Sequence, residues 1–321
     1  MTHDKSQMAN PHSVAIIGSG LVGRSWAIAF ARGGQSVRLF DRESGVAESA
    51  RNQIEPVLRS LAGDGLLNDQ SPADVLDRIA VADDLAAALS DADYVQENTP
   101  EDVDVKRSVF AELDAAAPPD AVIASSTSAI LPSRFTGGLS GASRCLVVHP
   151  LNPPHLCAAV EVVPGVETSP DAVRTAADLL RTIGSKPIVV DREIEGFVLN
   201  RLQGAVLDEA FKLVAEGYAS VDDVDAAIKD GLALRWSFMG PFETIDLNAP
   251  GGVADFLQRY KTAYETIGTE RPHRHEWSGD LAETITAARR RHLPVEQLAD
   301  RQTWRDQRLA ALVAHKNQQP E

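Results

Sequence analysis

The chain has 321 residues, a formal net charge of −15 and two cysteines. This length is long for a single hydrophobic core and fits two domains. The negative charge argues against non-specific nucleic-acid binding, which needs basic groups against phosphates, and it gives no support to a membrane-surface role. The sequence has no secretory signal pattern and no apolar run near 18 residues. With Cys145 and Cys157 interpreted as free thiols, we expect a cytoplasmic protein.

The most informative motif lies near the N-terminus. The apolar residues 13–17 predict a buried strand, Gly18-Ser-Gly-Leu-Val-Gly23 follows it, and residues 24–32 predict a helix. Residues 36–40 predict a second strand that ends at Asp41. A dinucleotide-binding βαβ unit has its strand, glycines, helix, strand and acidic residue in this order.

Each part of the glycine motif has a physical role in such a unit. Gly18 allows the tight turn, Gly20 lets the backbone approach a pyrophosphate, and Gly23 allows the helix to pack closely on the strand. Leu21 and Val22 lie within this motif and are candidate cofactor-binding residues, and the N–H groups at the N-terminus of the following helix would face the phosphates. The alternative is a glycine-rich turn that binds no ligand.

Asp41 bears on the choice of cofactor. A carboxylate at this place can accept both ribose hydroxyls of the adenosine half, and it repels the 2′-phosphate of NADP. Arg42 follows directly and could offset part of that repulsion. The sequence therefore predicts NAD as the cofactor.

The first part of the chain alternates strand and helix patterns, which predicts a mostly parallel sheet covered on both faces. The fold class is therefore α/β, a Rossmann-type doubly wound sheet. From residue 196 to residue 217 the pattern predicts one long helix, and the remainder is helical and charged. We expect an NAD-binding domain over residues 1–192 and an all-helical domain over residues 193–321. Further strands are expected at residues 79–81, 94–96, 121–124, 145–148, 160–163 and 188–190.

Two residues form the candidate catalytic pair. His149 closes a predicted strand, and Glu161 lies on another, between apolar neighbours. A carboxylate in such surroundings needs a partner. Glu161 would accept one ring N–H of His149, leaving the other nitrogen to take the hydroxyl proton of an alcohol. The alternatives are a strand-end histidine with a structural hydrogen bond and an edge carboxylate that faces water.

Ser128 and Asn200 are further candidates. Ser128 ends a Ser/Thr run after a predicted strand, where its hydroxyl can bind a substrate oxygen. Asn200 lies early in the long predicted helix, where its amide could hold the reacting oxygen as it becomes a carbonyl. The alternatives are a turn or capping serine and a solvated asparagine.

Several motifs in order resemble the 3-hydroxyacyl-CoA dehydrogenase family along nearly the whole chain. Within the family the sequence looks closest to the lambda-crystallin group, the L-gulonate 3-dehydrogenases. The matching stretches are Gly18-Ser-Gly-Leu-Val-Gly-Arg-Ser-Trp-Ala27, Ser125-Ser-Thr-Ser128, His149-Pro-Leu-Asn-Pro-Pro154, Gly196-Phe-Val-Leu-Asn-Arg-Leu-Gln203 and Gly240-Pro-Phe-Glu-Thr-Ile-Asp-Leu-Asn248.

The resemblance implies roles for these residues. It implies that His149 is the catalytic acid/base with Glu161 as its partner, and that Ser128 and Asn200 contact the reacting oxygen. It also implies a homodimer built through the helical domain.

The resemblance changes the interpretation of two charged residues. It implies that Glu101 and Lys106 lie near the cofactor. From the residues alone, they are better described as a solvated pair of loop charges.

One departure bears on the substrate. Acyl-CoA members carry a lysine-rich helix after the second strand, whereas residues 54–77 here contain no lysine and only one arginine, Arg59. CoA is strongly anionic and needs basic partners, so we expect a small hydroxy acid instead, with L-gulonate as the best candidate. Arg235 is the candidate cation for its carboxylate, because the matching segment of the lambda-crystallin group carries an arginine. The alternative is an exposed helix arginine.

The function predicted is NAD-dependent oxidation of the 3-hydroxyl of a 3-hydroxy acid, without a metal. The first alternative is a dehydrogenase for a CoA thioester such as 3-hydroxybutyryl-CoA, and the second is a carnitine-type dehydrogenase. Trp236, Phe238 and Phe242 make a quaternary-ammonium site conceivable, although core packing explains them better. An alternative of another class is a non-catalytic NAD-binding or structural protein of the crystallin type.

Overall fold

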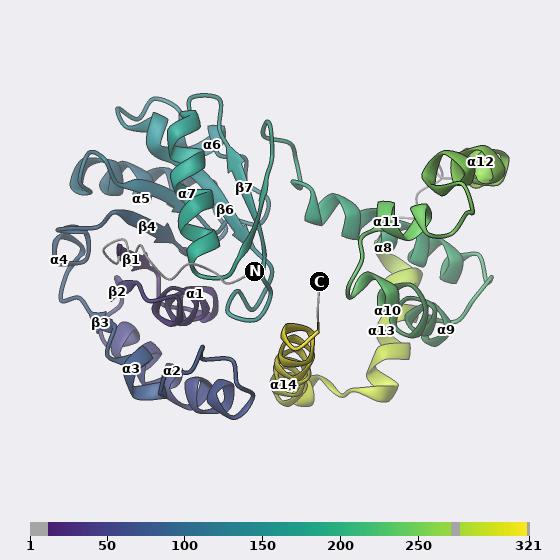
Figure 1. The fold of residues 1–321 in the computed structure, drawn as a ribbon, viewed down its shortest axis with the longest axis horizontal. Coiled ribbons are helices and arrows are strands. Elements are labelled where there is room, and N and C mark those ends of the chain that lie inside the picture. The colour runs from purple at the N-terminus through teal and green to yellow at the C-terminus, as the bar shows by residue number, and fades with distance from the viewer. Residues whose placement is uncertain (1–11, 271–276, 320–321) are drawn as a thin grey trace. The chain divides into compact units, whose positions relative to one another are not determined.

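The computed structural model describes residues 12–270 and 277–319. The chain divides into two compact units, Met1–Leu199 together with Asp306–Glu321, and Asn200–Arg305. The first unit contains an eight-stranded sheet flanked by helices, and the described part of the second consists of helices and loops (Figure 1). The predicted combination of an α/β unit and a helical unit is confirmed.

The sheet has the strand order β3-β2-β1-β4-β5-β6-β7-β8. All neighbouring strands are parallel except β6 and β7, which are antiparallel. The order reverses between β1 and β4, and open α/β sheets bind ligands beyond the carboxyl ends of the strands at such a reversal. The strands are β1 Ser13–Ile17, β2 Ser36–Phe40, β3 Ile79–Val81, β4 Tyr94–Glu97, β5 Val122–Ser125, β6 Cys145–Pro150, β7 Ala159–Pro164 and β8 Lys186–Val189.

Helices cover both faces of the sheet because side chains along each strand alternate between two cores. On β1, Val14 and Ile16 join the core with α1, α2 and α7, whereas Ala15 and Ile17 join the core with α4, α5 and α6. The helices of this unit are α1 Leu21–Arg32, α2 Val46–Gly63, α3 Pro72–Leu76, α4 Leu85–Leu89, α5 Val103–Ala116, α6 Ser133–Thr136 and α7 Pro170–Thr182.

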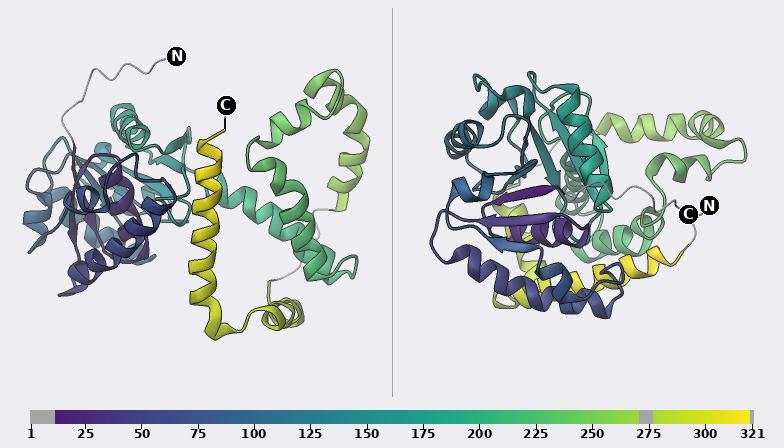
Figure 2. Two further views of the ribbon diagram at one scale, coloured as in Figure 1. Left: turned by 60° about the horizontal axis from the view of Figure 1, so that its bottom comes forward. Right: turned by 60° about the vertical axis from the view of Figure 1, so that its left-hand side comes forward.

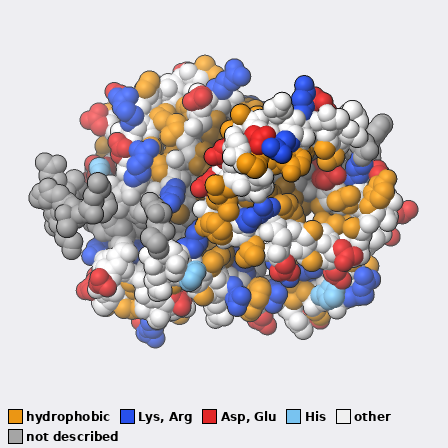
Figure 3. Space-filling view, turned by 45° about the vertical axis from the view of Figure 1, so that its right-hand side comes forward, with side chains coloured by type: hydrophobic (Ala, Val, Ile, Leu, Met, Phe, Trp, Pro, Cys, Tyr) orange, Lys and Arg blue, Asp and Glu red, His pale blue; other side chains and the backbone are white. Residues whose placement is uncertain are grey.

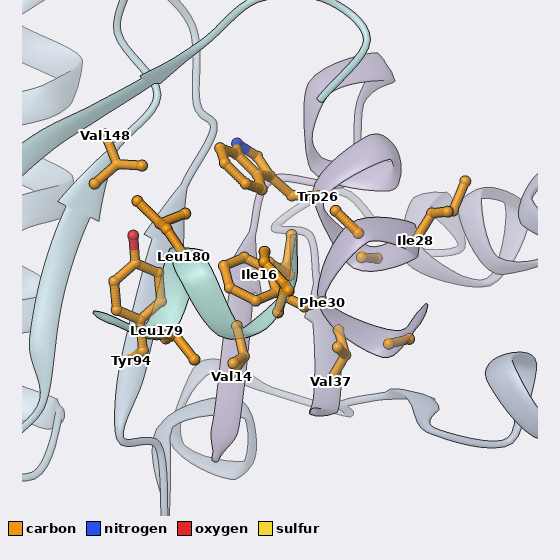
Figure 4. Close-up of a cluster of buried hydrophobic side chains, with 14 of the residues drawn as sticks. Val14, Ile16, Trp26, Ile28, Phe30, Val37, Tyr94, Val148, Leu179 and Leu180 are labelled. Atoms are coloured by element: carbon orange, nitrogen blue, oxygen red, sulfur yellow. The ribbon is translucent and has the colours of Figure 1, made fainter. Parts of the chain in front are cut away.

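Aromatic packing fixes α1 against the sheet. The rings of Trp26 and Phe30 on α1 lie 5.3 Å apart, and Phe30 lies 5.6 Å from the ring of Tyr94 on β4 (Figure 4). All three side chains are buried, and burying a side chain of this size stabilises the fold by roughly 1.5–3 kcal/mol. This packing holds the start of α1, and with it the glycine motif, in place.

The remaining α-helices begin at or after residue 199. They are α8 Leu199–Ala215, α9 Val221–Ala226, a π-helical turn Ala227–Leu232, α10 Ala233–Trp236, α11 Pro241–Asp246, α12 Gly252–Glu270, α13 Gly279–His292 and α14 Leu298–Asn317. Among the described residues, no helix combines the length and apolar character that a membrane span requires.

Two details differ from the sequence-based expectation. The long helix begins at Leu199 instead of Gly196, because Gly196 and Phe197 have positive φ angles of 75° and 49° that no right-handed helix contains. The last helix, α14 (yellow in Figure 2), groups from Asp306 onward with the sheet-containing unit. Its residue Ala310 is buried in the core formed by α1, α2 and α7, so the helical unit does not extend to the C-terminus.

Candidate active site

The glycine motif forms the turn between β1 and α1. Gly18 has φ = 89°, and a Cβ atom there would lie 2.8 Å from the carbonyl oxygen of Asn98. A Cβ atom on Gly23 would lie 2.0 Å from the carbonyl oxygen of Gly18, so neither position accepts a side chain. A Cβ atom on Gly20 would meet no atom within 4 Å. Protein packing therefore does not require glycine at position 20, and the space in front of it is open.

A pocket of about 480 Å³ opens beside this turn. Gly18, Gly20 and Asp41 line it together with apolar residues such as Leu85 and Val109. The Asp41 carboxylate accepts the backbone N–H of Ser19 at 2.7 Å, which ties the end of β2 to the glycine turn. A pocket of this size, with apolar walls and a fixed carboxylate, fits the adenosine half of a dinucleotide.

The pairing of β6 with β7 brings His149 and Glu161 together. In the antiparallel register these residues stand directly opposite each other. The His149 Nδ1 atom lies 2.7 Å from Glu161 Oε2, and both side chains are buried. The contact expected from the sequence is present.

The second oxygen of Glu161 is held by the backbone that leads into α8. Glu161 Oε1 accepts the N–H groups of Val198 at 2.6 Å and Leu199 at 2.9 Å. The left-handed turn at Gly196 and Phe197 directly precedes these two N–H groups, and the Phe197 ring lies 5.6 Å from that of His149. Sequence analysis missed this turn, because its residues fit the helical pattern.

The electrostatics of this arrangement assign the proton on the imidazole. Burial opposes ionisation of Glu161, but hydrogen bonds from His149 and from the two backbone N–H groups outweigh it and hold the pKa of Glu161 below its ordinary value. Because an ionised carboxylate can only accept, Nδ1 of His149 carries the hydrogen. The Nε2 atom is then the nitrogen that can accept a proton.

Glu101 organises the loop that contains Ser128. Its Oε1 atom accepts the backbone N–H groups of Ser128 and Ala129, each at 3.0 Å, and the hydroxyl of Thr127. This loop follows β5, whose residue Ser125 pairs with Val147 on β6. Ser128 therefore comes from the strand end next to the one that holds His149.

Lys106 is not a solvated loop charge. Its side chain is buried on α5, and its Nζ atom lies 3.0 and 3.1 Å from the two oxygens of Glu97. Ser125 donates its hydroxyl to Glu97 at 2.6 Å. Sequence analysis did not single out Glu97, and the only available signal was a carboxylate at the end of an apolar strand.

Two family models match the chain: 3-hydroxyacyl-CoA dehydrogenase, NAD binding domain, over residues 13–194, and 3-hydroxyacyl-CoA dehydrogenase, C-terminal domain, over residues 196–290. The chain belongs to the 3-hydroxyacyl-CoA dehydrogenase family. It is accordingly an NAD-dependent dehydrogenase that acts on a hydroxyl group, as the sequence predicts, and the glycine turn and pocket described above fit this cofactor.

Individual relatives cover nearly the full length. Lambda-crystallin of Oryctolagus cuniculus is 41% identical over 316 residues, which is 97% of this chain and 99% of the relative. An L-carnitine dehydrogenase of Pseudomonas sp is 33% identical over 300 residues, which is 93% of this chain and 92% of the relative. Among solved structures, the NAD+-dependent 5-formyl-3-hydroxy-2-methylpyridine 4-carboxylic acid 5-dehydrogenase matches with a TM-score of 0.83 at 28% identity, covering 97% of this chain and 100% of that one.

The remaining candidates belong to the helical unit of this family member. Asn200 lies in the first turn of α8. Arg235 lies on α10, and its Nη1 atom is 3.4 Å from the side-chain oxygen of Asn248. The roles of both residues stay predictions. Among the described residues, no group of three or more His, Cys, Asp or Glu side chains is arranged to hold a metal ion.

Proposed function

We propose that this dehydrogenase oxidises the 3-hydroxyl of a small 3-hydroxy acid and that His149 is its catalytic base. The observation that carries the proposal is the 2.7 Å contact between His149 Nδ1 and a Glu161 carboxylate whose other oxygen accepts two backbone N–H groups. A carboxylate held in this way cannot turn from the imidazole, so it fixes the tautomer and stabilises the imidazolium that forms.

In this mechanism His149 Nε2 takes the proton of the substrate hydroxyl. Ser128 and Asn200 contact the reacting oxygen, and Glu161 balances the positive charge on the ring. Bound NAD supplies the acceptor for the hydride.

Specific residues of the first unit would hold the cofactor. We assign the pyrophosphate to the turn from Gly18 through Gly20 to Gly23 and to the start of α1 at Leu21 and Val22. The adenosine ribose is assigned to Asp41. We place Glu101 and Lys106 near the cofactor, where they order the loop beside Ser128 and the end of β4.

A small substrate is favoured over a CoA thioester by the charges on α2. Arg59 pairs with Glu55 on the same helix, and Arg51 donates to the carbonyl oxygens of Ile79 and Leu76. Both guanidinium groups thus have partners within the protein. A CoA tail with several phosphate charges would have to displace them.

The substrate class is tested by initial rates of NADH formation. We expect L-gulonate to give a kcat/KM at least about tenfold above those of 3-hydroxybutyryl-CoA and L-carnitine. A tenfold preference requires a difference of only about 1.4 kcal/mol in transition-state binding between two substrates. A higher kcat/KM with the thioester or with L-carnitine contradicts the substrate assignment. A preference for L-carnitine would agree with the similarity to the L-carnitine dehydrogenase of Pseudomonas sp. Absence of turnover with L-gulonate also contradicts the substrate assignment.

Arg235 is proposed to bind the substrate carboxylate. Arg235→Met should raise KM for the best hydroxy acid by about tenfold or more, because a charge-assisted contact is worth about 1.5–3 kcal/mol. Arg259→Met is the matched control, since Arg259 is an exposed arginine of the same unit that pairs with Asp255. An unchanged KM in Arg235→Met, or an equal rise in the control, overturns the assignment.

We also propose a homodimer formed through the helical unit. Large hydrophobic side chains are exposed there, among them Phe238 by 70% and Phe242 by 80% of their surface. Figure 3 shows how hydrophobic side chains gather on one face of the molecule. An apolar groove of about 650 Å³ also lies along α8, α9 and α10. Exposed apolar surface of this kind supports an interface. Leu202→Glu, in this groove, should convert a dimer to a monomer in light scattering after size exclusion, and a wild-type monomer contradicts the proposal.

The prediction of a cytoplasmic location stands as a further proposal. Cys145 carries a free thiol, and burial raises its pKa to about 12. A free thiol supports a reducing compartment. Fractionation of cells that produce the protein tests it.

A further inference from the structure

The pocket beside the glycine turn carries three charged side chains: Asp41, Arg42 and Glu112. Asp41 is fixed, because one carboxylate oxygen accepts the N–H of Ser19 at 2.7 Å and the other accepts the N–H of Glu43 at 3.1 Å. Asp41 therefore cannot move away from a ligand that enters the pocket without breaking the turn.

Arg42 is the one positive charge among the residues that line this pocket. Its Nη2 atom lies 2.6 Å from Oε2 of Glu112, which comes from α5, 70 residues further along the chain. Both side chains also face solvent, with 72% of Arg42 and 41% of Glu112 exposed. The pair is thus held by attraction across the mouth of the pocket and not by burial.

This geometry decides how Arg42 meets a dinucleotide. NADP differs from NAD by a phosphate on the adenosine ribose, and an arginine near the acidic residue after β2 is the usual way to accommodate that phosphate. Arg42 stands at this place, so the Asp41 carboxylate alone does not determine cofactor choice. While Arg42 is paired with Glu112, however, an incoming 2′-phosphate meets two carboxylates and an arginine that is already neutralised.

We propose that Glu112 is a cofactor-specificity residue that acts by occupying Arg42. Glu112 draws the guanidinium to α5 and adds a second negative charge at the pocket mouth. The two effects have the same direction, because each disfavours a 2′-phosphate and neither touches the hydroxyls of an NAD ribose. The proposal concerns the cofactor alone and is independent of the substrate.

The test is direct binding of NAD+ and NADP+ to the full-length protein by isothermal titration calorimetry. Glu112→Gln should tighten NADP+ by about five- to tenfold and change NAD+ by less than about twofold, because the charge acts on the phosphate only. Adding Arg42→Met to this variant should remove most of the gain, since the freed guanidinium is its main source and only the loss of the Glu112 charge remains.

Asp104→Asn is the matched control. Asp104 lies on the same helix, and it pairs with Arg107 but does not line the pocket. An equal gain for NADP+ in this control assigns the effect to net charge and overturns the proposal. The proposal is also overturned if Glu112→Gln gives no gain for NADP+, or if its gain is undiminished when Arg42→Met is added.

Weak binding of NADP+ to the wild type does not prevent the measurement. The same series in an Asp41→Asn background removes the strongest repulsion, while the asparagine oxygen can still accept the N–H of Ser19. In that background Glu112→Gln must again favour NADP+ through Arg42. Failure there contradicts the proposal whatever the wild-type affinities are.

Discussion

Glu161 on β7 and Glu97 at the end of β4 are both fully withdrawn from solvent, yet the protein compensates the two carboxylates differently. Glu161 faces an imidazole and two backbone N–H groups. Glu97 faces the ammonium group of Lys106, the hydroxyl of Ser125 and the backbone N–H and hydroxyl of Thr99. Each arrangement satisfies a buried charge that would otherwise be costly.

The partner decides what each carboxylate can do. An ammonium with three donors and no acceptor atom cannot take a proton from a substrate, so the Glu97–Lys106 pair is a fixed anchor between β4 and α5. An imidazole that donates at Nδ1 still has an acceptor at Nε2, so the Glu161–His149 pair can move a proton. Burial and charge alone do not distinguish a structural carboxylate from a catalytic one, but the chemistry of its partner does.

The contrast between the Glu161–His149 pair and the Glu97–Lys106 pair is tested most directly by replacing His149. His149→Gln should lower kcat by at least about a hundredfold, because no acceptor for the hydroxyl proton remains. The affinity for NAD should stay unchanged in a binding titration. His315→Gln, which alters an exposed histidine, is the control and should keep full activity. If His149→Gln retains more than a tenth of the wild-type kcat, His149 is not the base.

Loss of the Glu97–Lys106 pair should lower the stability of the fold. Lys106→Met leaves the Glu97 charge buried without its counter-ion and should lower the free energy of unfolding by about 3–5 kcal/mol. The measurement is urea denaturation followed by circular dichroism. Lys229→Met, at an exposed Lys–Asp pair, should change stability by less than about 1 kcal/mol.

A variant that removes both charges makes this test decisive even if Lys106→Met does not fold. Glu97→Gln combined with Lys106→Met leaves no uncompensated charge and should recover part of the stability. If the double variant is no more stable than Lys106→Met, burial of an unpaired charge is not the cause of the loss.

Glu161→Gln tests whether the carboxylate positions the imidazole of His149. Glutamine can still accept the N–H groups of Val198 and Leu199 through its oxygen, but its NH2 group then faces Nδ1 of His149 and favours the tautomer with the hydrogen on Nε2. We expect kcat to fall by at least about tenfold, because this tautomer cannot take the hydroxyl proton and the imidazolium loses its counter-charge, and by no more than in His149→Gln. Steady-state kinetics of the two variants decide this, and an unchanged kcat in Glu161→Gln would mean that Glu161 does not position the imidazole.

Sequence predicted the parts of this molecule that depend on local pattern. The glycine turn, the sheet and the opposition of His149 and Glu161 follow from short-range signals, because strands alternate by two and the glycines have fixed backbone roles. The pairing of Lys106 with Glu97 could not be predicted in this way. A loop connects β4 to α5, and no periodic pattern in the sequence indicates the path of that loop.

Two other features depend on long-range packing. Residues 196–198 have a helical pattern, but Phe197 has a positive φ angle and its buried ring lies beside His149. The apolar stripe of α14 predicts a helix with one buried face, yet it does not say which core that face joins. The sequence therefore assigned all of residues 193–321 to one helical domain, whereas Ala310 is buried in the core of the sheet-containing unit.

A second buried histidine provides the smallest and most specific contrast. His155 is 8% exposed, and its Nδ1 atom has no hydrogen-bond partner among the described residues. Burial, together with the nearby positive charge of Arg32, lowers the pKa of His155 from its ordinary 6.5 to about 4. His149 is buried to a similar extent but faces a carboxylate instead of a guanidinium.

His155 should therefore make the fold sensitive to acid. Below pH 6.5 the unfolded chain binds a proton at this ring that the folded protein excludes, so stability falls as the pH decreases and levels off below about pH 4. At pH 5 the loss relative to pH 7.5 should be about 2 kcal/mol. His155→Leu removes the titrating ring, so the difference in unfolding free energy between wild type and variant should shift by that amount between the two pH values. A difference that is independent of pH means that the folded protein accommodates the imidazolium, and burial without a carboxylate would then not suffice to keep a histidine neutral in this protein.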